Sequence, residues 1–294
     1  MAIQIDVQRY QPRQVEQPYG QLLETQDFPR SDPWSWKMRQ VLAERATVFS
    51  GKPLIEGGIG DARNELEIYD ALHGVGFSRP TSIIGIDIET WRLDFAAHNL
   101  EQTDMPYELI YGGAYQWLAQ LPEKQIIEGN AIFCLPQAPL LIGESVADGY
   151  DARYIPDYAH PWDTYGLGLN FAVLTELGKR ATTDFTAFTM LNTRIPEEAL
   201  DAMVAAAGWR IVAKHSTEPL PVQQDPDTDI TYTIQHDDGQ RFYELTKSGT
   251  YEAISALEAE KRRKACLASG GGRAELNVYH HLIVYELQPA KIVN

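Results

Sequence analysis

The residues of this sequence best suited to chemistry surround a glycine-rich turn at residues 54–62, Leu-Ile-Glu-Gly-Gly-Ile-Gly-Asp-Ala. An apolar run ends at the acid Glu56 and continues into glycines, whose missing Cβ atoms let the backbone approach a ligand closely. A second acid, Asp87, ends the next apolar run. An acid at the end of a neighbouring parallel strand can accept hydrogen bonds from both hydroxyls of a ribose. The pattern therefore predicts a nucleoside site.

The acids in the turn indicate which nucleoside would fit. A dinucleotide site would prefer Gly-x-Gly-x-x-Gly and would place a pyrophosphate over the N-terminus of the next helix. Here Glu56 precedes the glycines and Asp61 occupies the turn. These acids suit a cationic amino-acid end better than a diphosphate. The turn therefore favours S-adenosyl-L-methionine over NAD, with a plain strand-to-helix turn as the alternative.

The elements that would position this site follow from an alternation of apolar runs with helical patterns. Such alternation is typical of a mostly parallel sheet covered by helices on both faces. The last apolar run returns to the sheet as a final core strand after an insertion. The expected strands span residues 53–56, 82–87, 107–111, 131–135, 185–191, 209–214 and 278–287.

Shifts in composition divide the chain into four parts: an N-terminal cap at 1–50, a core at 51–216, an insertion at 217–275 and a final core strand at 276–294. The cap should end in a helix over residues 35–45, after a proline-bounded turn.

The insertion should hold a hairpin and one helix. Residues 230–236 and 241–245 are joined by Asp-Asp-Gly, which favours a turn between two strands. The amphipathic helix is expected over residues 250–268, followed by a Gly-Gly-Gly hinge.

At the glycine turn the chain resembles the class I S-adenosylmethionine-dependent methyltransferases. Their first motif is an acid, any residue, Gly, any residue, Gly, any residue, and Gly or Ala; Glu56, Gly58, Gly60 and Ala62 match it. Asn99 ends the next expected helix, as an Asn commonly does in that class. The resemblance implies a Rossmann-like sheet, mostly parallel with an antiparallel C-terminal strand, and S-adenosylmethionine as the cofactor.

Within that class the chain looks most like the glutamine N-methyltransferases that modify release factors, over residues 25–215. Residues 28–34, Phe-Pro-Arg-Ser-Asp-Pro-Trp, resemble their Ile-Pro-Arg-Pro-Glu-Thr segment, and residues 111–115 stand where they carry Gly-Asp-Leu-Phe beside the adenine. Gly113 lacks the acid of that element. The cofactor contacts that the resemblance implies are Arg30, Glu56, Gly58, Gly60, Asp61, Asp87, Ile88, Ala114, Tyr115 and Leu135.

The expected fourth core strand runs into the place where amide and adenine N-methyltransferases carry Asn-Pro-Pro-Tyr. Here Leu135 replaces the Asn, Pro136 is kept, Gln137 replaces the second Pro and Ala138 replaces the Tyr. The groups that would hold a glutamine amide or a flipped adenine are therefore missing, which predicts a changed substrate. Gln137 supplies a displaced amide contact or is a structural turn residue, and Pro136 is expected to line the acceptor site.

A loop rich in aromatic and acidic residues, 148–166, follows at the ligand edge of the expected sheet. We expect Tyr154, Trp162 and Tyr165 to wall the substrate, although some of these rings must simply pack the loop. His160 is a candidate general base because its pKa lies near neutrality, with Asp163 to orient it. A surface histidine is the alternative. We find no metal-ligand spacing and expect no metal.

The formal charge of −16, from 41 acidic and 25 basic residues, disfavours nucleic-acid substrates. The basic run at residues 261–264 is interpreted as a solvated helix face. Cys134 and Cys266 form no paired framework, which indicates a reducing compartment. Without a signal segment or an apolar run of about 18 residues, we expect a soluble, cytoplasmic protein. The expected partners are a small-molecule substrate and, as an option, a second copy in a homodimer, with no membrane.

Three functions remain open from the sequence. The first is methyl transfer to a nitrogen, less readily an oxygen, of a small, partly apolar metabolite in natural-product biosynthesis. The second is methylation of a protein glutamine or another side chain. The third is a catalytically silent S-adenosylmethionine-binding partner protein, which the retained turn and Asp87 do not exclude.

Overall fold

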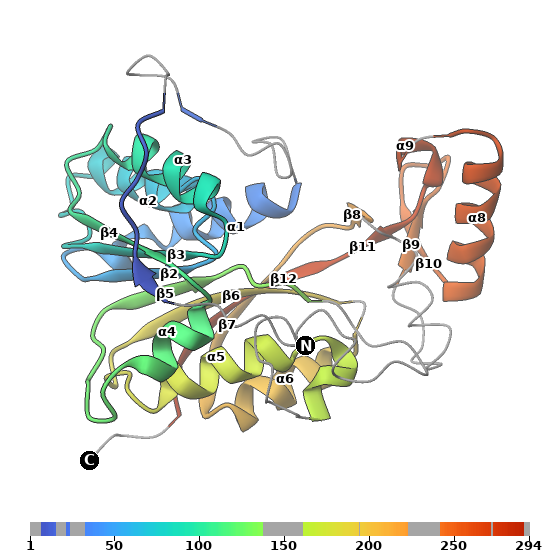
Figure 1. Cartoon of the computed structure of the whole chain (residues 1–294). Helices are drawn as coiled ribbons and strands as arrows, with labels where there is room; N and C mark the ends of the chain where they lie inside the picture. Colours follow the sequence, from blue (N-terminus) through green and yellow to red (C-terminus); the bar gives the residue numbers. More distant parts are fainter. Residues whose placement is uncertain are drawn as a thin grey trace.

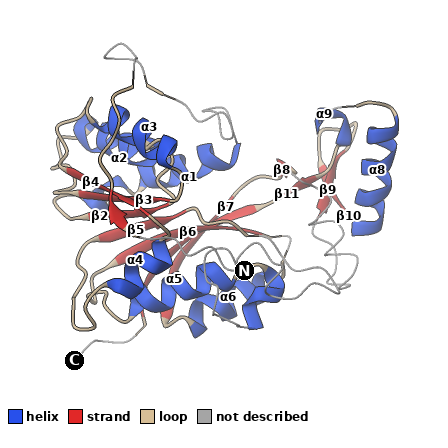
Figure 2. Ribbon diagram, in the orientation of Figure 1, coloured by secondary structure: helices blue, strands red, loops and turns tan. Residues whose placement is uncertain are grey.

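The computed structural model describes residues 7–15, 22–23, 33–137, 161–193, 195–222, 242–271 and 273–290. A large sheet with helices on both faces forms the main body, and a smaller sheet with its own helices forms a lobe beside it (Figures 1 and 2). The sequence-based prediction of a mostly parallel α/β sheet of Rossmann-like type is confirmed.

In the described part of the chain the main sheet has eight strands, and five of them, side by side, run parallel. The C-terminal strand is antiparallel, as predicted, and lies between two other strands. It spans Leu282–Pro289 and not residues 278–287, because Tyr279–His280 pairs in the smaller sheet. A short N-terminal strand pairs antiparallel with the opposite edge and was not predicted. In spatial order the strands are β1 (Gln8–Arg9), β4 (Tyr107–Tyr111), β3 (Ile83–Asp87), β2 (Leu54–Gly57), β5 (Asn130–Phe133), β6 (Thr186–Asn192), β12 (Leu282–Pro289) and β7 (Trp209–Ser216).

The strand order reverses between β2 and β5. The chain moves outward from β2 through β3 to β4, then returns to β5 on the other side of β2 and continues to β6. Open α/β sheets bind ligands at such a switch point, outside the carboxyl ends of the strands. The glycine turn after β2 and the residues after β5 therefore meet at the same edge.

Helices cover both faces of this sheet (Figure 1). The strands between them are apolar on both sides: Leu54 packs in one core cluster and its neighbour Ile55 in the other. One face carries α1 (Pro33–Glu44), α2 (Arg63–Gly74) and α3 (Thr90–Leu100), and the other carries α4 (Ala114–Gln120), α5 (Gly168–Gly178) and α6 (Glu197–Ala206). Short 3₁₀ helices η1 (Ala46–Phe49) and η4 (Pro161–Tyr165) precede β2 and α5.

Two described stretches ahead of α1, residues 7–15 and 22–23, are hydrogen-bonded to α3. The Tyr10 hydroxyl donates to Asp94 Oδ1 at 2.9 Å. Leu23 exchanges two backbone hydrogen bonds with the Asn99 side chain. The helix predicted for residues 35–45 is α1, which begins two residues earlier and ends one residue earlier.

The second lobe projects from the carboxyl edge of the main sheet. Leu282, the first residue of β12, pairs with Asn192 at the end of β6, so the chain between β7 and β12 leaves and re-enters at that edge. The lobe's helix α8 lies on the side away from the main body (Figure 1). Its elements are β8 (Leu220–Pro221), β9 (Phe242–Leu245), β10 (Tyr251–Ile254), α8 (Ala256–Ala268), α9 (Arg273–Leu276) and β11 (Tyr279–His280), with sheet order β10-β9-β11-β8.

The local prediction for this lobe was partly wrong. The predicted first strand, 230–236, lies outside the described residues, and β9 pairs with β10, which was not predicted as a strand. The predicted helix over residues 250–268 begins only at Ala256, because residues 251–254 complete that hairpin. Ser255 caps the helix by accepting from the Glu258 backbone N–H at 3.2 Å. This is the N-terminal signal of a capping box.

Candidate functional site

The glycine turn has the backbone conformation that its sequence requires. Gly58 and Gly60 have φ values of +82° and +57°, in the left-handed region that glycine adopts without steric cost. Ala62, the residue just before α2, also lies in the left-handed region, with φ +60°, although it is not a glycine. The backbone N–H groups of Gly58 and Ile59 both donate to Ile86 O, at 2.8 and 3.1 Å. The turn is therefore fixed against the end of β3.

Asp87 reinforces this attachment from the end of β3. Its Oδ2 accepts from the Gly60 N–H at 3.1 Å, and its Oδ1 accepts from the Glu89 N–H at 2.9 Å. Burial raises the pKa of the Asp87 carboxyl, and these backbone hydrogen bonds oppose that rise. A carboxylate oxygen can accept a second hydrogen bond. Asp87 can thus hold the turn and still receive ribose hydroxyls.

Asn99 ties the other side of the turn to α3. Its side chain is fully buried, and its Nδ2 donates to the backbone oxygens of Asp61 at 2.7 Å and Leu23 at 3.0 Å. The end of α3 is therefore joined to both the glycine turn and the N-terminal segment. The sequence had indicated Asn99 only by its position at the end of the helix.

The acid Asp61 already has a cationic partner. Its Oδ2 lies 2.9 Å from Arg63 Nη2, and both side chains are largely buried. Asp61 had been expected to suit a cationic ligand, but part of its charge is compensated by Arg63. The remaining attraction for a cationic ligand must come from the other acids of the turn.

Glu56 lies beneath the turn in a buried acidic pair. Its side chain is 1% exposed, and its Oε1 accepts from Asn64 Nδ2 at 2.7 Å. Glu65, on the buried side of α2, lies in hydrogen-bonding contact with it. Burial, and then the charge of Glu65, raise the pKa of Glu56 well above its ordinary range.

Sequence reasoning missed Asn64 and Glu65. A signal was present for the second, because Glu65, Ile68 and Leu72 recur at helical spacing and all three are buried. An acid in that apolar stripe marks a polar contact inside the fold rather than a solvated face.

The remaining predicted cofactor residues meet at the same edge of the sheet. A Cβ placed on Gly57 would lie 2.9 Å from Ala114 Cβ and 2.9 Å from the Phe133 ring, so the end of β2 touches the start of α4 and the end of β5. The side chains of Ile88, Tyr115 and Leu135 are partly buried against this core cluster. Arg30 lies outside the described residues.

The residues after β5 are held by two side-chain amides. Gln137 Oε1 accepts from the Asn192 N–H at 3.1 Å, which ties it to the end of β6. Asn170 Nδ2 donates to Pro136 O at 3.3 Å. Gln137 Nε2 and Asn170 Oδ1 are buried and have no hydrogen-bond partner within the described part of the chain. Asn170 was missed, although it is an isolated amide in the otherwise apolar start of α5.

Part of the predicted substrate wall is described, and it packs against the core. The Trp162 ring lies 6.3 Å from the Phe171 ring, centroid to centroid, and Tyr165 also contacts the main cluster. Asp163 is buried at 3% exposure. Packing is therefore one role of Trp162, and substrate contact stays a prediction. Tyr154 and His160 lie outside the described residues.

The basic run on α8 is ion-paired along its length. Lys261 pairs with Glu258, and Arg262 pairs with both Glu244 and Glu258. Arg263 and Lys264 pair with Glu260. The charges of this helix face are thus compensated by neighbouring carboxylates, as expected for a solvated face.

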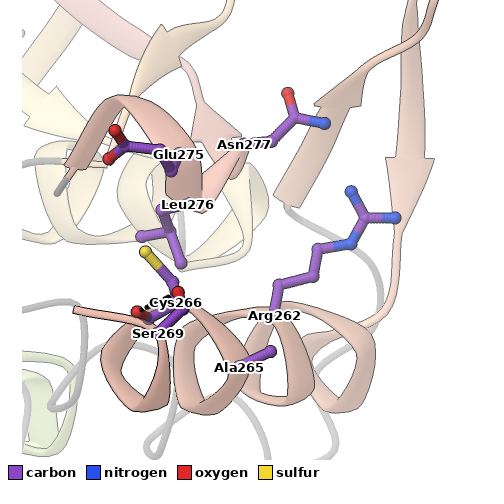
Figure 3. A pocket seen from close by; sticks show the side chains of 7 residues that line it. All are labelled: Arg262, Ala265, Cys266, Ser269, Glu275, Leu276 and Asn277. Atoms are coloured by element: carbon purple, nitrogen blue, oxygen red, sulfur yellow. Dashed lines mark hydrogen bonds between the residues drawn. The ribbon is translucent and has the colours of Figure 1, made fainter. Parts of the chain in front are cut away.

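Arg262 also lines a cavity of about 310 Å³ in the second lobe (Figure 3). Its guanidinium is engaged by Glu244, and the Ser269 hydroxyl donates to Cys266 O at 2.8 Å. These polar groups serve the lobe's own structure. The lining residues are Arg262, Ala265, Cys266, Ser269, Glu275, Leu276 and Asn277.

Two features are absent from the described residues. No group of three or more His, Cys, Asp or Glu side chains within them could hold a metal ion. No helix among them is long and apolar enough to cross a membrane.

Comparisons with known proteins give likeness in structure alone. No family model matches the sequence, and no curated protein does. A protein from Listeria monocytogenes assigned as a class I S-adenosylmethionine-dependent methyltransferase is 11% identical, with a TM-score of 0.46 over 90% of this chain and 62% of that one. A precorrin-6y C5,15-methyltransferase from Geobacter metallireducens is 10% identical, with a TM-score of 0.42 over 90% and 93%.

A precorrin 8w decarboxylase from Methanobacterium thermoautotrophicum is 11% identical, with a TM-score of 0.44 over 90% of this chain and 95% of that one. These values describe a general similarity of sheet and helices. Function must therefore be inferred from this chain's own residues.

Proposed function

We propose that this protein is an S-adenosyl-L-methionine-dependent methyltransferase. The observation that carries the proposal is the turn from Glu56 to Ala62, which holds three left-handed residues and opens at the switch point of the sheet. Asp87 Oδ2 accepts from the Gly60 N–H, which brings a ribose-binding acid into register with the turn. A closely approached backbone beside such an acid suits a nucleoside ligand.

The acids at the turn favour an amino-acid-bearing nucleoside over a dinucleotide. Because Asp61 is paired with Arg63, the acids that a pyrophosphate would meet are Glu56 at the end of β2 and Glu89 just after β3, and like charges repel. The sulfonium and ammonium groups of S-adenosylmethionine are instead attracted by that field. Glu56, Gly58, Gly60, Asp87 and further contacts from Ile88, Ala114, Tyr115 and Leu135 would hold the cofactor, with Arg30 from the N-terminal segment.

The proposed acceptor is a nitrogen, less readily an oxygen, of a small, partly apolar metabolite, as in natural-product biosynthesis. Leu135 offers an apolar wall where amide N-methyltransferases carry a polar Asn. Gln137 spends its Oε1 on Asn192, so it holds the end of β6 and keeps only its Nε2 for another contact. Pro136, Tyr154, Trp162 and Tyr165 would complete the pocket.

The bound cofactor would supply an electrophilic methyl group, and the protein's work is positional. The acceptor lone pair must be held in line with the sulfur–methyl bond in a pocket poor in water. Trp162 and Tyr165 exclude water on one side of that pocket, and Leu135 does so on another. His160, oriented by Asp163, would take the proton that the acceptor nitrogen loses.

The test is transfer of label from methyl-tritiated S-adenosylmethionine. The purified protein is incubated with a small-molecule extract, or with a release-factor glutamine peptide as protein acceptor. We expect label in the small-molecule fraction. Robust labelling of the glutamine peptide would refute the metabolite acceptor. Cofactor binding without transfer to either would favour a silent binding protein.

A further inference from the structure

Glu56 and Glu65 form a buried acidic pair under the glycine turn, and no salt bridge in the part of the chain that the structure describes explains why these two carboxyl groups are buried. Glu56 and Glu65 are 1% and 0% exposed, and burying a carboxylate without a cation is costly. Asn64 Nδ2 donates to Glu56 Oε1 at 2.7 Å. Among the described residues, no donor group forms a hydrogen bond to Glu56 Oε2 or to either Glu65 oxygen. Nothing in these contacts neutralises two negative charges.

The charged and titratable neighbours do not supply the missing cation. On the turn, Asp61 is paired with Arg63, and the Asp61 charge acts on Glu65 to disfavour its ionised form. After β5, Cys134 is a neutral thiol, because burial raises its pKa to about 12. On α1, which packs on α2, Arg39 is buried, but it is not among the groups that act on the pKa of Glu56 or Glu65.

Two carboxyl groups in contact satisfy each other when they hold a single proton. One then donates an O–H to the other, and the pair carries one negative charge instead of two. Glu56 and Glu65 are two such groups: both are buried, three of their four carboxyl oxygens receive no hydrogen bond from another described group, and each carboxyl acts on the pKa of the other. The pair has one proton to lose, and a positive charge placed nearby favours that loss.

We propose that Glu56 and Glu65 share one proton in the free protein, and that they act as specificity-determining residues which favour the cationic methyl donor over the demethylated product. The inference rests on the proposed function. S-adenosylmethionine carries a sulfonium charge that S-adenosylhomocysteine lacks, while the ammonium and carboxylate ends are the same in both. Only the donor adds charge at the sulfur, so the donor alone gains from the second carboxylate.

The sign of the pH dependence follows by linkage. A nearby cation stabilises the ionised pair, so donor binding releases the shared proton to solvent. The affinity for S-adenosylmethionine should therefore rise with pH, relative to that for S-adenosylhomocysteine. The sulfonium carries one unit charge, and its interaction with the second carboxylate passes through a partly buried region of intermediate dielectric constant. We expect it to change the ratio of the product and donor dissociation constants by about tenfold, or about 1.4 kcal/mol. The benefit is easier exchange of spent product for fresh donor.

The experiment measures dissociation constants of both ligands for the full-length protein by calorimetry, between about pH 6 and pH 8.5. The ratio of product to donor dissociation constants should rise by about tenfold over that range. Titrations in two buffers of different ionisation enthalpy should show proton release on donor binding that exceeds the release on product binding. Neither measurement depends on a variant that must fold.

Glu65→Gln tests the pair itself. A glutamine amide donates permanently to Glu56, so no shared proton is left, and the ratio should become flat with pH. Glu67→Gln is the matched control, because it removes the same charge from the same helix at a partly exposed position. It should keep the wild-type slope.

Three outcomes would overturn the inference. A flat wild-type ratio, with both ligands bound, removes the pair's role but leaves the proposed function standing. An unchanged slope in Glu65→Gln, or the same loss in Glu67→Gln, assigns the effect to other groups. Failure of the folded protein to bind either ligand sinks the proposed function, and this inference with it.

Discussion

Replacing Asp87 with alanine tests whether the end of β3 holds both the turn and the ligand. The substitution removes a carboxylate that accepts from Gly60 at 3.1 Å and from Glu89 at 2.9 Å. The two backbone N–H groups lose their partner. The ribose hydroxyls of a bound cofactor would lose theirs as well.

The magnitude follows from the net value of such contacts. Hydrogen bonds to a charged group contribute about 1.5–3 kcal/mol each. The cost of burying the Asp87 carboxylate reduces this gain, and that burial is also the largest influence on the pKa of Asp87. We therefore expect cofactor binding to weaken by about 1–3 kcal/mol, or about 5- to 150-fold. Unfolding should become easier by a similar amount, because a buried N–H left unpaired costs about 1–3 kcal/mol.

The assay is calorimetric titration with S-adenosylhomocysteine, together with thermal unfolding to confirm the fold. Asp94→Ala is a matched control, because it also removes an acid. In the described residues the Asp94 carboxylate accepts hydrogen bonds only from Tyr10 and Arg13 of the N-terminal segment. Its affinity should stay near wild type. Wild-type affinity in folded Asp87→Ala would refute the assignment of Asp87 to the ribose.

Other variants test separate parts of the site. Asn99→Ala should lower the free energy of unfolding by about 1–3 kcal/mol, measured by urea denaturation, because it leaves buried backbone groups unpaired; a change near zero would contradict its role. Trp162→Ala or Tyr165→Ala should slow transfer to the metabolite acceptor by on the order of 10²-fold with nearly unchanged S-adenosylhomocysteine affinity, and wild-type rates would contradict the pocket. A maleimide should modify Cys266 before Cys134 in the native protein, read by mass spectrometry, because burial keeps the Cys134 thiol protonated.

The sequence predicted the core sheet well because its signal is strong there. The runs at residues 82–87 and 131–135 are almost continuously apolar, and they become β3 and β5, whose residues are nearly all buried. Strands buried on both faces are continuously apolar, which is easy to recognise in a sequence. The turn at residues 56–62 was recognisable because its glycines serve a left-handed backbone.

The lobe and the acidic pair were harder to predict, because they depend on contacts between distant residues. The strand at residues 251–254 directly precedes a helix, and its short mixed sequence fits a helical pattern as well as a strand pattern. Only its pairing with β9 shows that it is a strand. The stripe of α2 indicates that Glu65 is buried, but only the packing of α2 on β2 brings it close to Glu56. Asn170 and Gln137 likewise meet only when β5, α5 and β6 come together.

Titration of the purified wild-type protein with three ligands tests the central claim most directly. We expect calorimetry to show binding of S-adenosylmethionine and S-adenosylhomocysteine and no binding of NAD, because the turn between Glu56 and Ala62 offers acids where a diphosphate would lie. Absence of S-adenosylhomocysteine binding at about millimolar ligand, in protein shown to be folded, would contradict the account.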